Sequence, residues 1–133
     1  MANLRARRMS LLQVEFIDCR MTGLNGGEVE AQDVLIREGD QRYSRLQASQ
    51  FRSTEFDGCN LEESELQDSD FSGCIFRRCN MRGVEMGNAK LKDADLRGSV
   101  VEGMNIGLAG LRGAVVDPAQ AMLFALLLGI RIE

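Results

Sequence analysis

A five-residue period runs through most of the sequence and limits the fold more than any other feature does. From residue 46 to residue 116, every fifth position is apolar in an unbroken run of fifteen. Since 44% of all residues are hydrophobic, such a run has a chance probability on the order of 10⁻⁶ to 10⁻⁵. The period is therefore a structural repeat. The apolar positions are Leu46, Phe51, Phe56, Leu61, Leu66, Phe71, Phe76, Met81, Met86, Leu91, Leu96, Val101, Ile106, Leu111 and Val116.

A second register lies two residues before the first and holds small side chains, with Met104 as its one large member. A period of five matches neither the period of about 3.6 of a helix nor that of about 2 of a strand. It requires a bend after each short extended piece, and each piece then buries one large and one small side chain. Glycine is frequent two residues after the large position, where a corner favours a residue that adopts positive φ.

The repeats resemble those of the pentapeptide repeat proteins. Three segments match the A(D/N)LXX motif of that family: Cys59-Asn60-Leu61-Glu62-Glu63, Ala89-Lys90-Leu91-Lys92-Asp93 and Ala94-Asp95-Leu96-Arg97-Gly98. The resemblance covers nearly the whole chain. It implies an all-β fold, a right-handed quadrilateral parallel β-helix that forms a solenoid with four five-residue sides in each coil.

The residues by themselves favour four sides only modestly. In a four-sided coil, stacked residues are twenty apart, as Phe56 and Phe76 or Cys59 and Cys79 are. A three-sided coil would stack residues fifteen apart, and Phe56 with Phe71 also satisfies that spacing. From the residues alone, both arrangements remain open.

The pattern divides the chain into a repeat region, 1–116, and a C-terminal capping or dimerisation segment, 117–133. Within the repeat region the register continues in phase through Thr22–Tyr43, although several positions there are poorly occupied. We interpret 22–43 as degenerate repeats, and a loop is the alternative interpretation.

A helix is expected directly after the repeats. Asp117 fits the N-cap and Pro118 the first helical position, where a missing backbone N–H has no intrahelical partner to lose. We expect the helix to run from about Pro118 to Leu128 and to end at Gly129 in a left-handed cap. The alternation in Ile130–Ile132 is typical of a short strand.

This helix is apolar on all sides, with Gln120 as its one polar interior residue. A helix that only covered the last coil would need one apolar face, so we expect a homodimer in which the C-terminal segments meet. The alternative is a monomer whose Ile130–Glu133 tail folds back over the helix. The segment also resembles the C-terminal dimerisation helix of the mycobacterial fluoroquinolone-resistance branch of the family. The expected interface residues are Met122, Phe124, Leu127, Leu128, Ile130 and Ile132.

The composition argues against catalysis. The chain has no histidine, which removes histidine-based nucleophile pairs, acid–base catalysis by imidazole and histidine metal ligands. All four cysteines (Cys19, Cys59, Cys74, Cys79) fall in the small inward register, and their spacings contain no zinc-binding C-x₂-C pair. We therefore expect no catalytic residues, no cofactor, no metal site and no enzymatic activity.

The charge and apolar runs bear on location and partners. A net charge of −4 makes direct binding to nucleic acid an unfavourable interpretation. The longest apolar run, Ala121–Ile130, is shorter than the roughly 20 residues that a membrane span requires. The first residues form no apolar signal-peptide segment. We therefore expect a cytoplasmic protein that binds neither membrane nor nucleic acid.

The outward side chains carry the expected function. Two of the four columns of outward residues sum to about −3 each, from the charges in the sequence. The family resemblance implies a DNA mimic that binds a type II topoisomerase, DNA gyrase or topoisomerase IV, and gives protection from inhibitors such as quinolones. The acids assigned to this role are Glu65, Asp68 and Glu85 on one side, with Glu55, Asp57 and Asp95 on the next.

Two features weaken that interpretation. Arg77, Arg78 and Arg97 interrupt one of the acidic columns, and −4 is a mild charge for a DNA mimic. The alternative is a regulatory or scaffold solenoid that binds an unrelated protein partner.

Overall fold

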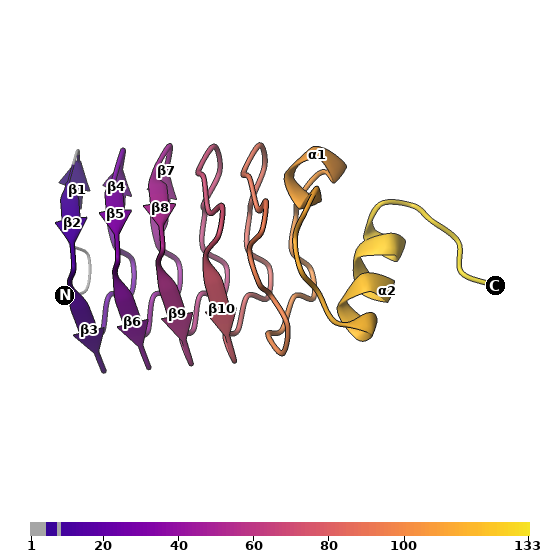
Figure 1. The fold of residues 1–133 in the computed structure, drawn as a ribbon, viewed down its shortest axis with the longest axis horizontal. Coiled ribbons are helices and arrows are strands. Elements are labelled where there is room, and N and C mark those ends of the chain that lie inside the picture. The colour runs from indigo at the N-terminus through magenta and orange to yellow at the C-terminus, as the bar shows by residue number, and fades with distance from the viewer. Residues whose placement is uncertain (1–4, 8) are drawn as a thin grey trace.

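The structure is a computed structural model that describes the backbone of residues 5–7 and 9–133, and side chains from Met9 onward. Three-residue strands stack into a parallel β-solenoid that ends in a helix (Figure 1). Residues 1–4 and 8 of the predicted repeat region lie outside the described residues. The expected quadrilateral parallel β-helix is confirmed.

In the described residues, ten strands form three parallel sheets, each on one side of the solenoid. The first holds β1 (Arg5–Arg7), β4 (Asn25–Gly27) and β7 (Arg45–Gln47). The second holds β2 (Ser10–Leu12), β5 (Glu30–Gln32) and β8 (Gln50–Arg52). The third holds β3 (Glu15–Ile17), β6 (Leu35–Arg37), β9 (Glu55–Asp57) and β10 (Ile75–Arg77). We call these sides faces A, B and C.

Face D, the fourth side, is held by isolated bridges that link Arg20, Asp40, Asn60, Asn80 and Val100. Similar bridges extend the other faces: Arg45, Glu65, Glu85 and Asn105 on face A, Gln50, Asp70 and Lys90 on face B, and Ile75, Asp95 and Val115 on face C. Every paired residue lies twenty positions from its partner, as in Phe56↔Phe76. The four-sided coil is therefore established and the three-sided one excluded. We number the coils 1 (to residue 23), 2 (24–43), 3 (44–63), 4 (64–83), 5 (84–103) and 6 (104–116).

The corners lie where the sequence predicted them, two residues after each large inward position. Gly58 has φ +66° there, and non-glycine residues at equivalent positions, such as Ala48 with φ +54°, adopt the same left-handed conformation. This region is costly for residues with a Cβ, which explains the enrichment of glycine at these positions. The corner geometry therefore fixes the five-residue period.

The core is filled by the two inward registers. The rings of Phe51 and Phe71 stack with centroids 4.8 Å apart, and those of Phe56 and Phe76 at 4.9 Å, with edge contacts between the two stacks. In the small register, side chains also donate hydrogen bonds to carbonyl oxygens of the preceding coil. Ser69 Oγ, for example, donates to the Leu46 oxygen at 2.8 Å. Serine and cysteine suit this position because they are small and can donate such a hydrogen bond, whereas Ala89 and Ala94 suit it by size alone.

The segment 22–43, for which the sequence left coil and loop open, contains strands β4, β5 and β6, which pair at a spacing of twenty residues. Its weak pattern has a physical basis in coil 2, because small or polar residues fill the large inward slot. Gly26 and Ala31 occupy that slot on faces A and B, and the buried Gln41 occupies it on face D. Coil 2 thus keeps the backbone conformation of the repeat but buries less apolar side-chain volume.

The solenoid ends differently from a simple continuation of the repeat. The short helix α1 (Leu108–Leu111) replaces the last side of face B, so Ala109 is exposed although its position belongs to the inward register. Helix α2 (Pro118–Leu127) then follows Asp117 as N-cap. The strand expected at Ile130–Ile132 is not formed, because these exposed residues have no neighbouring strand to pair with. In the described part of the chain, neither helix is long and apolar enough to cross a bilayer.

Candidate interaction surfaces

The sites available to a partner are the outward faces and the C-terminal helix. The tube interior is packed with side chains, and no group of three or more His, Cys, Asp or Glu residues in the described part of the chain could hold a metal ion. The hollows at the surface are shallow. One of about 450 Å³ lies at the corner between faces D and A and is lined by Tyr43, Arg45, Glu62, Glu63 and Glu65.

Face A carries three of the acids assigned to partner binding. Glu65 forms an ion pair with Arg45 at 2.9 Å, and Glu85 accepts hydrogen bonds from Asn105 Nδ2 at 2.8 and 2.9 Å. Asp68 lies at an exposed corner and forms no ion pair with any side chain that the structure describes. From coil 2 onward this face has Arg45 as its single cation against several acids. From coil 2 onward, face A therefore presents a net negative surface.

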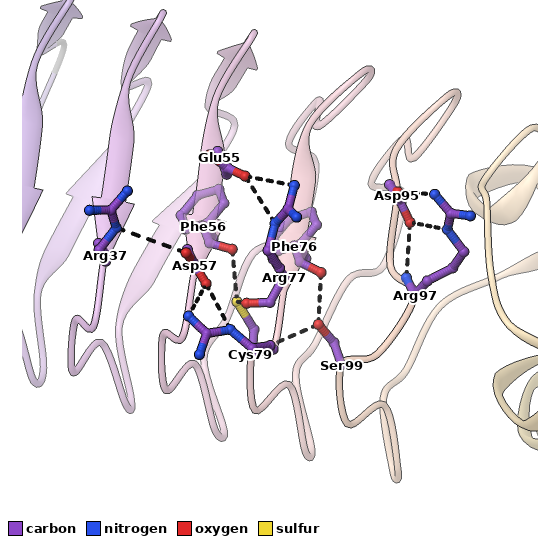
Figure 2. A network of polar contacts seen from close by, with 11 residues as sticks. Arg37, Glu55, Phe56, Asp57, Phe76, Arg77, Cys79, Asp95, Arg97 and Ser99 are labelled. Carbon is purple, nitrogen blue, oxygen red and sulfur yellow. Dashed lines mark hydrogen bonds and ion pairs between the residues drawn. The ribbon is translucent and has the colours of Figure 1, made fainter.

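Face C carries the other three acids, and each of them has an arginine partner (Figure 2). Glu55 pairs with Arg77 at 3.2 Å and Asp95 with Arg97 at 2.8 Å. Asp57 pairs with Arg78 at 2.7 Å and lies 3.9 Å from Arg37. The hydrogen bond from the Arg97 guanidinium holds the pKa of Asp95 below its ordinary value. The arginines thus form a ladder that neutralises much of the acidic charge on this face.

The two acidic sets lie on opposite faces of the solenoid, which corrects the expectation that they occupy neighbouring sides. Glu55 and Glu65 are ten residues apart, and ten residues correspond to two of the four sides. A flat partner surface could contact only one set at a time. Only a cleft that straddles the rod could contact both.

The C-terminal helix exposes apolar side chains away from the last coil. Met122, Leu127, Ile130 and Ile132 from the expected interface are exposed, and so is Leu126, which is 58% accessible. Phe124 corrects the expected set: it is only 5% exposed and packs into the core cluster, because it faces the end of the tube. Leu128 is half-buried. Phe124 is therefore part of the lid of the solenoid.

Gln120 is a structural residue whose role the sequence analysis missed. Its side-chain Nε2 donates to the carbonyl oxygens of Leu96 and Ser99, and its Oε1 accepts from the Asp117 N–H at 3.1 Å. Asp117 accepts in return from the Gln120 N–H at 2.9 Å and from the Gly98 N–H at 3.1 Å. These backbone hydrogen bonds lower the pKa of Asp117. The signal was the Asp-Pro-Ala-Gln spacing, which is a capping box.

The cysteines lie inside the tube. Cys59, Cys74 and Cys79 are buried, and Cys19 is half-buried in coil 1. Burial raises the pKa of the Cys74 thiol to about 12. A hydrogen bond with Cys59, together with burial, also raises the pKa of Cys79. Raised pKa values of this kind make thiols poor nucleophiles at neutral pH.

Comparisons with known proteins agree with this architecture. The model of the family "Pentapeptide repeat region" matches residues 49–116, which are 68 of the 133 residues. No curated protein sequence matches the chain.

The chain is also similar to solved structures of low sequence identity. A pentapeptide repeat protein (Rfr23) from the cyanobacterium Cyanothece 51142 is 14% identical, with a TM-score of 0.38 over 84% of this chain and 86% of that one. QnrB1, described as a plasmid-mediated fluoroquinolone resistance protein, is also 14% identical, with a TM-score of 0.39 over 91% of this chain and 100% of that one. HetL of the cyanobacterium Nostoc sp. strain PCC 7120, described as involved in heterocyst differentiation regulation, is 12% identical, with a TM-score of 0.29 over 83% and 90%.

Proposed function

We propose that this chain, which belongs to the pentapeptide repeat family, is a non-enzymatic interaction protein. Its outer faces bind another protein. Its five-residue sides form strips of exposed side chains, while the interior of the described part of the chain is filled by the core side chains. Specificity on such a surface must come from the pattern of charges along each face.

The favoured partner is a type II topoisomerase, DNA gyrase or topoisomerase IV, bound through face A as a mimic of DNA. The observation that carries this proposal is the net negative charge of face A from coil 2 onward, where Asp68 and Glu85 have no cationic partner among the described side chains. Stacked carboxylates on a narrow rod present an anionic strip to a surface that normally holds phosphates. The activity to test is protection from quinolones, which the sequence resemblance implies.

We further propose that two copies associate through their C-terminal segments. Met122, Leu126, Leu127, Ile130 and Ile132 form an exposed apolar surface, and helix α2 itself contains no charged residue to oppose its burial. Exposed apolar surface of this kind is typical of an interface. A dimer joined at this end would about double the length of the rod available to a partner.

A scaffold or regulatory solenoid that binds an unrelated protein is the second candidate. It is favoured by the ion-pair ladder of face C, where Glu55, Asp57 and Asp95 are neutralised by arginines. A face of alternating charge suits a partner of mixed charge better than a surface built to hold DNA.

A supercoiling assay with gyrase, in the presence and absence of a quinolone, tests the topoisomerase proposal. The wild-type protein should alter supercoiling or protect it at micromolar concentration. The double variant Asp68→Asn/Glu85→Gln on face A should lose most of this effect. The control Glu15→Gln/Asp18→Asn makes the same charge change at a strand and a corner of face C and should keep the effect. If the wild-type protein has no effect on gyrase or topoisomerase IV, the topoisomerase proposal is wrong and the scaffold proposal remains.

A further inference from the structure

The cations of the molecule are distributed unevenly between the faces. Among side chains 9–133, eight arginines form ion pairs with acids, and Arg20 also has an interaction partner. The cations without an ion pair in this part of the chain are Arg52, Lys90, Lys92 and Arg112, and all of them belong to the columns of face B. Face B therefore carries the four cations of the described side chains that form no ion pair within the monomer.

The first outward column of face B has an ordered charge pattern. Its residues stack as Glu30, Gln50, Asp70 and Lys90, one coil apart, through the pairings Glu30↔Gln50, Gln50↔Asp70 and Asp70↔Lys90. The acid at one end and the lysine at the other are three coils apart, about 14 Å at the spacing of β-strands. Glu30 and Lys90 thus carry opposite charges at the two ends of this stretch, with the neutral Gln50 and a second acid, Asp70, between them.

We propose that face B binds face B of a second copy of this chain in antiparallel orientation. The twofold axis lies in the interface, parallel to the strands, between coils 3 and 4. Each column of one copy then lies opposite the same column of the other copy, with the order of the coils reversed. Glu30 of one copy then faces Lys90 of the other, and Gln50 faces Asp70, each contact occurring twice. In the next column, Arg52 faces Ser72 and lies diagonal to Asp70.

The centre of this arrangement satisfies groups that the monomer leaves partly open. Burial tends to raise the pKa of Asp70, but hydrogen bonds from Ser72 and the positive charges of Lys90 and Arg52 outweigh it and hold that pKa below its ordinary value. Asp70 is therefore an ionised hydrogen-bond acceptor that lies opposite Gln50 of the second copy. Asp33 and Asp93 face each other at the rim, where water and salt screen their repulsion.

The shape of face B also fits a lysine from a second copy. A hollow of about 200 Å³ lies on face B at coils 2 and 3, lined by Glu30, Ala31, Gln32, Gln50 and Arg52. In the antiparallel arrangement this hollow lies opposite Lys90, which is exposed on coil 5. The Lys90 ammonium group can then enter the hollow and meet the Glu30 carboxylate.

The area of the face sets the strength of the association. Five coils at about 4.8 Å and strands of about 10 Å give a few hundred Å² per copy, below the roughly 800 Å² of a standard interface. The contact should be weak and sensitive to salt. It is a side-to-side contact, and so differs from the end-to-end contact proposed for helix α2.

Sedimentation velocity of the full chain tests the proposal. We would measure association up to about 1 mM protein at about 50 mM and about 500 mM salt, in the Leu126→Glu background so that the C-terminal contact is weakened. We expect association at low salt that is lost at high salt. Glu30→Lys or Lys90→Glu alone should weaken it about tenfold, because two attractive pairs become repulsive. The swap Glu30→Lys/Lys90→Glu should restore it to within about threefold of the background protein.

The matched control is Glu15→Lys/Lys90→Glu, which has the same net charge as the swap but places the new lysine on face C. It should not restore association. Thermal melts of each variant confirm that the solenoid remains folded. The proposal is overturned if the background protein shows no salt-dependent association, or if the swap associates no better than the control.

Discussion

The side-chain amide of Gln120 donates to the carbonyl oxygen of Ser99 at 2.8 Å, and so joins helix α2 to the open end of the β-helix. The same amide group also donates to the Leu96 oxygen, and Gln120 is 3% exposed. In the preceding coil, the carbonyl equivalent to that of Ser99 accepts from an N–H of the next coil, as the Cys79 oxygen does from the Val100 N–H at 2.9 Å, and helix α2 takes the place of that coil beyond Ser99. The one polar side chain in the interior of an apolar helix therefore provides hydrogen bonds to carbonyl oxygens at the C-terminal end of the β-helix.

Replacing Gln120 should destabilise the C-terminal end more than any exposed change in α2. Gln120→Ala removes two buried hydrogen bonds and half of the capping box, and we expect a loss of about 2–3 kcal/mol in the free energy of unfolding. Chemical denaturation followed by circular dichroism measures this loss. Ala121→Ser, on the exposed side of the helix, is the control and should change stability by less than about 0.5 kcal/mol. Equal effects of the two changes would contradict the role assigned to Gln120.

Mutations should distinguish the residue that closes the end of the core from the proposed dimer surface, because Phe124 faces the tube and Leu126 faces solvent. Phe124→Ala leaves a cavity at the end of the core and should cost about 3 kcal/mol or more. Leu126→Glu should leave the unfolding free energy nearly unchanged and convert a dimer to a monomer. Light scattering gives the masses. A wild-type protein with monomeric mass at all concentrations would refute the C-terminal dimer.

The sequence predicted the repeating part of the molecule better than its ends. The five-residue period follows from local geometry, since each side repeats the same inward pair and corner, so the positions of corners such as Gly58 could be read directly. The end of the solenoid has no such repetition. Because α2 is apolar all round, its pattern could not show that Phe124 faces the core and Leu126 faces solvent. Ion pairs such as Arg78 with Asp57 depend on the stacking of coils, so the column charges alone overstated the acidity of face C.

Coil 2 contains a polar group that weakens the core. Gln41 occupies the inward position that Met21, Leu61 and Met81 fill on the same face, and its buried Oε1 has no hydrogen-bond partner. A buried, unpaired amide oxygen costs about 1–3 kcal/mol. Gln41→Leu should therefore raise the free energy of unfolding by about 1 kcal/mol or more.

The measurement is a urea titration, with Gln47→Leu as the control. Gln47 is exposed on face A, and its replacement should leave stability within about 0.5 kcal/mol of the wild type. A loss of stability in Gln41→Leu would show that the amide makes interactions that the packing of coil 2 does not reveal.

Low pH should destabilise the solenoid through its aspartate–arginine pairs. Hydrogen bonds from Arg42 lower the pKa of Asp40, and those from Arg97 lower the pKa of Asp95. Because each pKa is lower in the folded than in the unfolded chain, the stabilisation is complete above the ordinary aspartate value of about 3.9 and is lost as the pH falls through the folded value. Thermal melts should thus be nearly constant from about pH 7 to 5 and decline below about pH 4. Asp40→Asn/Asp95→Asn should lower the melting temperature at neutral pH and flatten the decline, and an equally steep decline in this variant would show that other acids control it.

The left-handed corners offer a direct test of what sets the period. Ala48 has φ +54° at an exposed corner, a conformation that costs a residue with a Cβ about 1 kcal/mol or more relative to glycine. Glycine is more flexible in the unfolded chain, which offsets part of this gain. We expect Ala48→Gly to stabilise the protein by about 0.5 kcal/mol in chemical denaturation. The control Ala125→Gly, within α2, places glycine where φ is helical and should destabilise by about 1 kcal/mol. If both changes destabilised the protein to the same extent, the corner conformation would not be the reason for glycine in the repeat.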